Sequence, residues 1–520
     1  MDLLIKIPML VVFFGIMIGI GIYCKKHSTN VDGFVLGGRS VGPWLTAFAY
    51  GTSYFSAVVF VGYAGQFGWK YGIAATWAGI GNAIIGSLMA WAILGRRTRV
   101  MTQHLDSATM PQFFGKRFAS PGLKLAASAI IFIFLIPYTA SLYNGLSRLF
   151  GMAFDIDYGV CVIAMAIITA IYVIAGGYMA TAINDFVQGI IMIVGIIAVI
   201  AAVLKGQGGF MESIRQLGQV SDPEASDIPG AFISFLGPDP ANLLGVVILT
   251  SLGTWGLPQM VQKFYAIKSE KAINKGMIIS TVFALVVAGG CYFLGGFGRL
   301  FSDRVDVATE GYDAIIPAML SDLSPFLISI VVILVLSASM STLSSLVLTS
   351  SSTLTLDFIK GTLVKKMDEK RQLLWIRLLI VVFILISVVL ALIQHSSSVT
   401  FIAQLMGISW GALAGAFLAP FLFGLYWKRT SKAAVWASFL FSTVVMISNI
   451  FFPQYFPTIL RTPINAGVFC MLAGLVIVPA VSLLTKKPDA EHIRQVFSCY
   501  DRTVTVCVTD SIGDTKEEIL

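Results

Sequence analysis

Long apolar segments dominate this chain and constrain its fold more than any other feature. A helix needs about 20 mainly apolar residues to cross a membrane, and about 13 such segments fit into the 520 residues. Lipid offers the backbone no hydrogen-bond partners, so each segment must satisfy its own polar groups as a helix. The expected helices are Pro8–Tyr23, Pro43–Phe67, Gly72–Leu94, Leu123–Tyr143, Tyr158–Ala175, Ala180–Leu204, Asn242–Val261, Met277–Phe297, Pro325–Leu348, Leu374–Ile393, Phe401–Tyr426, Ala434–Phe452 and Ile464–Leu484. The predicted fold class is an all-α polytopic membrane protein.

Composition excludes other classes of protein. The chain is 57% hydrophobic and only 12% charged, whereas soluble domains carry about 25% charged residues. A soluble enzyme, a nucleic-acid-binding protein and a disordered protein are therefore not expected. The six cysteines are scattered and show no metal-binding spacing.

The distribution of basic residues predicts the orientation, because Lys and Arg are concentrated in cytoplasmic loops. With the N-terminus outside, 27 of the 35 basic residues fall on the inner side and 8 on the outer side. We therefore expect a multi-pass protein of the plasma (inner) membrane with a cytoplasmic C-terminus. The predicted transmembrane domain covers residues 1–488, and residues 489–520 form a cytoplasmic tail.

Two of the expected helices look interrupted. Residues 49–57 and 250–258 combine glycines with hydroxyl-bearing side chains at mid-membrane depth, and Gly51-Thr52 matches Gly253-Thr254 in position. Either segment alone would fit close helix packing. Paired broken helices in corresponding halves instead indicate inverted repeats with a binding site between them. The repeats are expected at about residues 43–205 and 240–426.

The ninth expected helix carries a row of hydroxyl groups. They recur at helical spacing and so share one face, at Ser337, Ser341, Ser344, Ser345 and Ser352. A single Ser or Thr often bonds only to its own helix, but a row this dense predicts a polar lining. Hard oxygen ligands favour a small alkali cation over a transition metal.

Asp185 is the main candidate for a charge inside the membrane. It lies at the start of the sixth expected helix, where two interpretations are open. A carboxylate within a membrane helix is by default a functional candidate. An Asp at the membrane interface is also favourable at a helix N-terminus. Few other ionisable groups are central, which favours a metal cation over a proton as the coupling ion.

At these residues the chain resembles the sodium/solute symporter family, and within it the pantothenate/proline-type sodium symporters. The resemblance covers nearly the whole length. Its motifs are Gly37-Gly38-Arg39-Ser40-Val41-Gly42, Thr109-Met110-Pro111 with Arg117-Phe118, Ala175-Gly176-Gly177 with Asp185 and Gln188, Gly256-Leu257-Pro258, and Met340-Ser341-Thr342-Leu343-Ser344. The resemblance implies a leucine-transporter-like core of five plus five helices, with one helix before it and two after.

The resemblance also implies the site residues. The sodium site would use the carbonyls of Thr52, Phe55 and Ala338 and the hydroxyls of Ser341 and Thr342. Some family members have a second sodium site, which matches Asp185, Ser341, Ser344 and Ser345. The solute cavity would be lined by Tyr54, Ser56, Val59, Gln66, Thr254, Trp255 and Pro258.

The resulting functional prediction is a secondary active transporter. It would carry a small carboxylate or amino-acid-like solute, such as pantothenate, proline or a monocarboxylate, into the cell with sodium by alternating access. Tyr54 stands where the family's proline carriers have Asp, which argues against proline. The alternatives are a solute sensor with the transporter fold and a symporter of a sugar-like solute. We expect no enzymatic activity, no cofactor beyond the coupling sodium, no nucleic-acid partner and a monomer.

Overall fold

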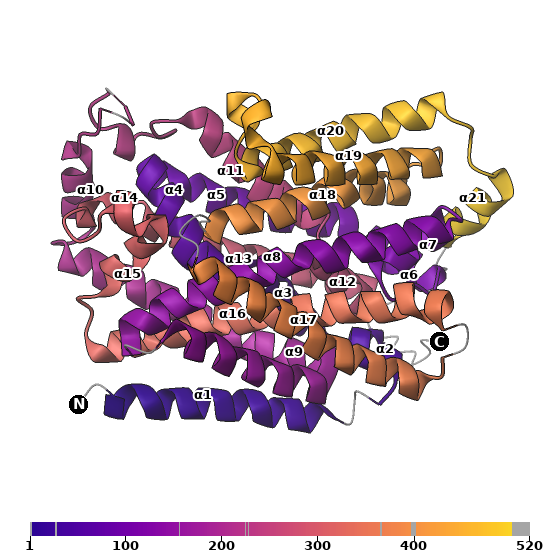
Figure 1. Cartoon of the computed structure of the whole chain (residues 1–520), viewed down its shortest axis with the longest axis horizontal. Coiled ribbons are helices and arrows are strands. Elements are labelled where there is room, and N and C mark those ends of the chain that lie inside the picture. The colour runs from indigo at the N-terminus through magenta and orange to yellow at the C-terminus, as the bar shows by residue number, and fades with distance from the viewer. Residues whose placement is uncertain are drawn as a thin grey trace, which may run out of the picture.

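The chain folds as a bundle of helices that run mainly along its longest axis (Figure 1). The computed structural model describes residues 3–25, 29–154, 157–223, 225–226, 228–364, 367–396 and 402–501. Within these residues there are three isolated β-bridges and no named strand. The predicted all-α class is therefore confirmed. Most of the predicted tail, residues 502–520, lies outside the described residues.

In the described part of the chain, nine long helices form the bulk of the bundle. They are α1 (Leu3–Cys24), α8 (Pro121–Phe154), α9 (Tyr158–Gly206), α13 (Glu270–Gly295), α16 (Pro325–Thr353), α17 (Glu369–Ser396), α18 (Ile402–Tyr426), α19 (Lys432–Phe451) and α20 (Pro463–Leu484). Shorter helices connect or break them. These are α2 (Val31–Leu36), α3 (Pro43–Tyr54), α4 (Ala64–Tyr71), α5 (Thr76–Gly81), α6 (Arg96–His104), α7 (Met110–Arg117), α10 (Phe210–Gln219), α11 (Pro240–Leu252), α12 (Pro258–Ala266), α14 (Val307–Glu310), α15 (Ile315–Leu320) and α21 (Ala490–Phe497).

The number of membrane-crossing helices differs from the expected 13. In the described chain 10 helices are long and apolar enough to cross a membrane, or 11 if the bent pair α11–α12 is one span. Two of the expected boundaries account for the difference. Residues Val58–His104 form one run that contains the end of the second expected helix and all of the third, and the fifth is a shorter apolar stretch, Tyr158–Ile171, within α9. The count of 13 is therefore not confirmed.

Glycine marks both places where these runs change direction. Gly72 follows α4 with φ 60° and ψ −143°, and Gly177 interrupts α9 with φ 56° and ψ −150°. Residues with a side chain rarely adopt a positive φ. A Cβ on Gly177 would also lie 2.8 Å from the Phe34 carbonyl oxygen. These glycines thus end one helical segment and start the next.

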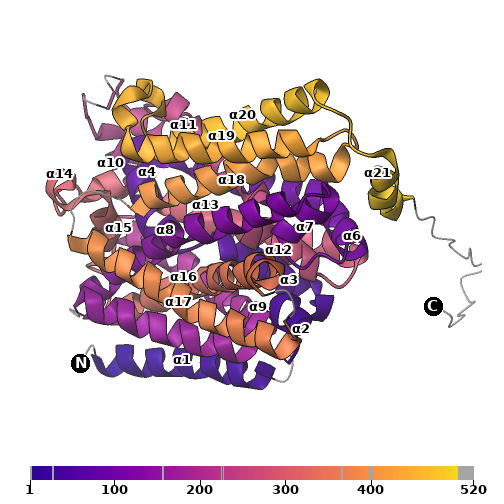
Figure 2. The same cartoon turned by 45° about the vertical axis from the view of Figure 1, so that its right-hand side comes forward.

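The two ends of the bundle are built differently. The N-terminus, α10, α14 and α15 lie at one end, while α6, α7 and α21 lie at the other (Figures 1 and 2). α18, α19 and α20 pack on one another along one side, and α1 packs on α9 at the opposite side. Between them α16 is buried over every residue from 334 to 353. The hydroxyl row therefore faces protein on all sides.

Backbone contacts at glycine bring some helices unusually close. A Cβ on Gly68 of α4 would lie 1.9 Å from the carbonyl oxygen of Gly295 in α13. A Cβ on Gly295 would lie 2.0 Å from the carbonyl oxygen of Ala64 in α4. Small residues permit this approach because no side chain separates the two backbones. α4, which continues the first broken helix, is thus held directly against α13.

The glycine-arginine motif near residue 38 connects three parts of the α6/α7 end. Gly37, Gly38 and Arg39 all have positive φ, between 52° and 64°. This turn directs the Arg39 guanidinium to the carbonyl oxygens of Ser107, 2.7 Å away, and Tyr265, 3.3 Å away. Burial lowers the pKa of Arg39, and Asp32 is the main charge that opposes this shift. The motif therefore ties the start of α3 to the end of α12.

Candidate functional site

The first broken helix opens directly after α3. Phe55 leaves the helical conformation with φ −82° and ψ 124°, and Ser56 is also non-helical before the π-helix η3 (Val58–Tyr63) begins. The predicted interruption of the second span is therefore present. Glycine is needed at position 51, shortly before the break, because a Cβ there would lie 2.4 Å from the Phe283 ring. An interrupted helix leaves carbonyl groups without their usual partners.

Hydroxyl groups of α16 bond to the carbonyls released by this break. Ser341 Oγ donates to the Thr52 carbonyl at 3.1 Å, and Thr342 Oγ1 lies 3.1 Å from Thr52 O and 3.2 Å from Phe55 O. Both hydroxyls also lie near the Ala338 carbonyl, at 3.0 Å and 3.1 Å. The five residues predicted for the sodium site thus bring their oxygens to one place.

This group of oxygens has the chemistry of an alkali-cation site. All five residues are fully buried, and the donor set is three carbonyl oxygens and two hydroxyl oxygens. Carbonyls of unwound membrane helices are known to coordinate sodium in transporters. Each hydroxyl can turn its hydrogen away and offer a lone pair instead. The residues therefore fit a sodium ion as cargo.

The rest of the hydroxyl row divides into three groups. Ser345 Oγ lies 2.8 Å from Ser53 Oγ of α3 and accepts from the Lys263 ammonium of α12 at 3.0 Å. Ser344 and Ser352 donate to carbonyls of their own helix. Ser337 is buried, and its hydroxyl makes no hydrogen bond to the described residues. Only the central part of the row therefore makes polar contacts to α3 and α12 among the described residues, and the rest bonds within α16 or is unbonded.

Asp185 is fully buried in α9 and faces a lysine. Lys263 Nζ lies 3.9 Å from Asp185 Oδ2, and the two side chains are 3% and 0% exposed. Neither Asp185 oxygen makes a hydrogen bond to the described residues. Of the residues predicted for a second sodium ion, Asp185 and Ser345 therefore both contact the same ammonium group. Asp185 is fully buried in α9, eight residues after the Gly177 break. Its interpretation as a functional carboxylate and its interpretation as an interfacial residue near a helix N-terminus both stay predictions.

Lys263 is a functional candidate that the sequence does not single out. It follows the expected helix Asn242–Val261 and therefore counts among the 27 basic residues expected on the inner side. In the structure α12 continues to Ala266 and buries Gln262 and Lys263. The sequence does contain a signal for this longer helix. Phe264 and Tyr265 follow Val261 at i+3 and i+4 and so continue its apolar face beyond Lys263.

The second broken helix lies where it was predicted. α11 ends at Leu252, residues Gly253–Trp255 form a short 3-10 turn, and α12 starts at Pro258 with a bend of 40°. Thr254 Oγ1 donates to the Gly86 carbonyl at 3.0 Å, and Trp255 Nε1 donates to the Ile85 carbonyl at 2.9 Å. The break is thus anchored to the π-helix η5 (Asn82–Met89).

The residues predicted for solute binding fall into three groups. Tyr54 and Thr254 line a cavity of about 10 Å³ between the two broken helices, together with Asn82 and Met260. Gln66 instead lines a larger cavity of about 520 Å³ at the α10 end. The remaining four are buried within or directly after the breaks: Ser56, Val59, Trp255 and Pro258.

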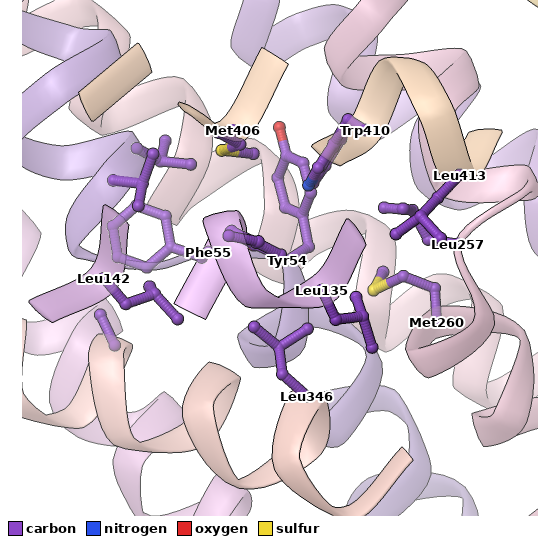
Figure 3. Packing of buried hydrophobic residues seen from close by; sticks show 14 of the residues in the cluster. Tyr54, Phe55, Leu135, Leu142, Leu257, Met260, Leu346, Met406, Trp410 and Leu413 are labelled. Carbon is purple, nitrogen blue, oxygen red and sulfur yellow. The ribbon is translucent and has the colours of Figure 1, made fainter. Parts of the chain in front are cut away.

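An aromatic cluster beside the first break was not predicted. The Tyr54 ring lies 5.8 Å from the Trp410 ring of α18, and Trp410 lies 6.1 Å from Tyr138 of α8. The Tyr54 and Tyr138 hydroxyls and the Trp410 indole NH make no hydrogen bond to the described residues. Figure 3 shows Tyr54 beside Trp410, with Leu257 and Met260 of the second broken helix nearby. These three buried polar atoms are candidates for contacts to a solute.

The larger cavity is lined by charges of both signs. Arg299 Nη1 pairs with Asp222 Oδ2 at 2.8 Å, and its Nε donates to the Trp69 carbonyl at 2.7 Å. Burial lowers the pKa of Arg299, and the hydrogen bond that Arg299 donates to Asp222 opposes this shift. Lys70 and Asp239 line the same cavity. This cavity lies next to α4, which continues the first broken helix and contributes Gln66 to the cavity wall.

Comparison with known proteins gives one consistent result. Residues 34–440 match the model of the Sodium:solute symporter family. The osmoregulated proline transporter OpuE of Bacillus subtilis is 28% identical over 93% of this chain and 95% of its own length. A sodium/proline symporter of Staphylococcus aureus is 29% identical over 93% of each chain. A solved Na+-coupled sialic acid symporter in a substrate-bound outward-open state superimposes with a TM-score of 0.73 at 16% identity, over 93% of this chain and 99% of that one.

Proposed function

The chain belongs to the sodium:solute symporter family, and we propose that it carries sodium and a small organic solute together into the cell by alternating access. The observation that carries this proposal is the group of five buried oxygens between the α3 break and α16. A secondary transporter needs an ion site at a broken helix, next to the solute, so that occupancy of one affects the other.

Sodium binds to the carbonyl oxygens of Thr52, Phe55 and Ala338 and the hydroxyls of Ser341 and Thr342. The ion replaces the hydroxyl-to-carbonyl hydrogen bonds that link α3 to α16. It fixes the conformation of the break, and Tyr54 lies directly in front of it in the chain. Sodium therefore raises the affinity for the solute, and the solute raises the affinity for sodium by the same factor.

The solute occupies the space between the two broken helices. Tyr54 and Thr254 line the small cavity there. Ser56, Val59, Trp255 and Pro258, which are buried within or directly after the breaks, complete the lining when the helices separate, and Gln66 lines the larger cavity at the α10 end. The cavity is about 10 Å³, so the site opens only when the helices move apart to admit the solute. The buried hydroxyls of Tyr54 and Tyr138 and the Trp410 indole offer it polar contacts.

The solute is a small carboxylate or amino-acid-like molecule. Two relatives are named as proline transporters, so proline belongs in the screen together with pantothenate and monocarboxylates, although Tyr54 in place of the proline carriers' Asp argues against proline. A sugar needs many hydrogen bonds, and Val58 and Val59 contribute none from their side chains. The protein acts as a transporter and not as an enzyme, and sodium is its coupling ion.

The chain lies in the plasma (inner) membrane with its N-terminus outside and its C-terminus in the cytoplasm. This orientation is supported by the excess of basic residues in the segments at the α6/α7 end. The excess remains when Lys263, which is buried, is left out of the count. The transporter domain covers residues 1–488, with repeats at about 43–205 and 240–426, and residues 489–520 form the tail. The protein functions as a monomer.

Uptake into proteoliposomes tests the proposal. Purified protein is reconstituted, and the uptake of labelled proline, pantothenate and lactate is measured with an inward sodium gradient and with an equal potassium gradient. We expect accumulation of one solute with sodium only. Accumulation that is independent of sodium would refute the coupling. Solute binding without any accumulation would instead indicate a sensor.

A further inference from the structure

A lysine lies inside the membrane domain at a place where the family resemblance implies a cation. Lys263 is 3% exposed, and its neighbour Asp185 is 0% exposed. Charged side chains at this depth are costly and normally pair with one another. Lys263 Nζ is 3.9 Å from Asp185 Oδ2, and this is the only salt bridge of Asp185 among the described residues. The carboxylate is thus compensated by the protein itself.

The surroundings of the ammonium group resemble the coordination of a cation. Ser345 Oγ lies 3.0 Å from Lys263 Nζ, and the Tyr178 ring centroid lies 5.0 Å from it. The charge, the hydroxyl and the aromatic face come from α9 and α16, whereas the lysine comes from α12. An ammonium group is a compact point charge that such a set can hold in place of a metal ion.

We propose that the Lys263 ammonium is the resident cation of the Asp185 site, so that this carrier couples one sodium ion to each solute instead of two. A sodium ion bound to Asp185 and Ser345 would lie next to a fixed like charge in a low-dielectric interior, where repulsion is strong. The inference rests on the proposed sodium coupling and adds the number of ions to it.

The resident charge also connects the two broken helices. Ser53, which hydrogen-bonds Ser345 at 2.8 Å, directly follows Thr52 of the sodium site. Ser345 lies four residues, or one helical turn, after Ser341. Lys263 belongs to α12, the second half of the other broken helix. A permanent cation thus links α12 to the helix turn next to the sodium ion.

The ratio of sodium to solute in the unmodified protein is the first test. It is obtained in proteoliposomes from the membrane voltage at which solute flux reverses under fixed sodium and solute gradients. For a zwitterionic solute we expect about one charge per solute and a sodium Hill coefficient of about 1. For a monovalent carboxylate, one sodium ion makes transport electroneutral, so the ratio is obtained instead from the sodium gradient that just balances a fixed solute gradient. A ratio of two would overturn the inference and leave sodium coupling intact. A flux that does not depend on sodium would refute the proposed function instead.

Variants then test whether Lys263 sets this ratio. Lys263→Met removes the charge and keeps the length, so Asp185 becomes free to bind sodium. Bound ²²Na per purified protein molecule should rise from about one to about two, a readout that does not require transport. Lys263→Arg, which keeps the charge, should stay at one, and so should Lys263→Met combined with Asp185→Asn. Unchanged ²²Na binding in Lys263→Met would overturn the inference. If this variant does not fold, the reversal measurement on the unmodified protein decides.

Discussion

Thr342 is the most informative position for testing the sodium site, because one oxygen atom contacts three carbonyls. Thr342→Val keeps the shape of the side chain and removes this oxygen, which lies 3.1 Å from Thr52 O, 3.2 Å from Phe55 O and 3.1 Å from Ala338 O. The change therefore removes one of five proposed sodium ligands without creating a cavity of any size.

The expected magnitude is a difference between two states. Loss of a polar partner for a charged group costs about 1.5–3 kcal/mol in the sodium-bound form. The same oxygen also holds carbonyls in the sodium-free form, and losing those neutral hydrogen bonds costs about 1 kcal/mol. The difference of about 0.5–2 kcal/mol corresponds to a sodium affinity lower by about 2- to 30-fold, since 1.4 kcal/mol is tenfold.

The assay is the initial rate of solute uptake into proteoliposomes at increasing sodium concentration. Thr342→Ser restores the oxygen and should recover most of the affinity. Ser352→Ala is the matched control, because Ser352 lies on the same helix and donates only to Leu348 and Thr349 of that helix. The reasoning fails if Thr342→Val and Ser352→Ala have the same half-saturating sodium concentration.

Three further predictions concern the solute, the packing and the ion. Tyr54→Phe should raise the KM for the solute by about 2- to 12-fold and leave sodium dependence unchanged, since the Tyr54 hydroxyl is buried and makes no hydrogen bond to the described residues. An unchanged KM, as expected for the control Tyr265→Phe, would exclude Tyr54 from the site. Gly68→Ala should destabilise the protein by about 1–3 kcal/mol or more, because its Cβ would overlap the Gly295 carbonyl. Gly151→Ala is the control, because the Cβ there meets no described atom within 4 Å. Equal melting temperatures of the two variants would contradict this packing. Sodium at about 100 times its dissociation constant should stabilise the folded protein by about 2.7 kcal/mol, and thermal unfolding in equimolar choline chloride is the comparison that would expose a mere salt effect.

The local parts of the site could be predicted from the sequence. Glycine and hydroxyl residues around Thr52 and Thr254 reveal both breaks, because unwinding at membrane depth depends on nearby residues. The convergence of Thr52, Phe55 and Ala338 on Ser341 and Thr342 followed from the family resemblance and not from composition.

The parts that depend on distant contacts could not be predicted. Lys263 resembles a loop lysine until α9 supplies Asp185 as its partner. Trp410 and Tyr138 are ordinary core aromatics until α8 and α18 place them against Tyr54. The number of crossings was not confirmed for a similar reason, since Gly177 interrupts α9, where a Cβ would lie against Phe34, and the apolar stretch before this break is short.

The hydrogen bonds from Ser341 and Thr342 to the α3 break have a consequence for the return of the empty transporter. A symporter must return empty after releasing its cargo, and a site of bare buried carbonyls would make that form costly. Here the same hydroxyls that we propose as ligands satisfy those carbonyls when no ion is present. Unloading therefore exchanges one set of bonds for another, and the empty carrier keeps α3 and α16 joined while it resets.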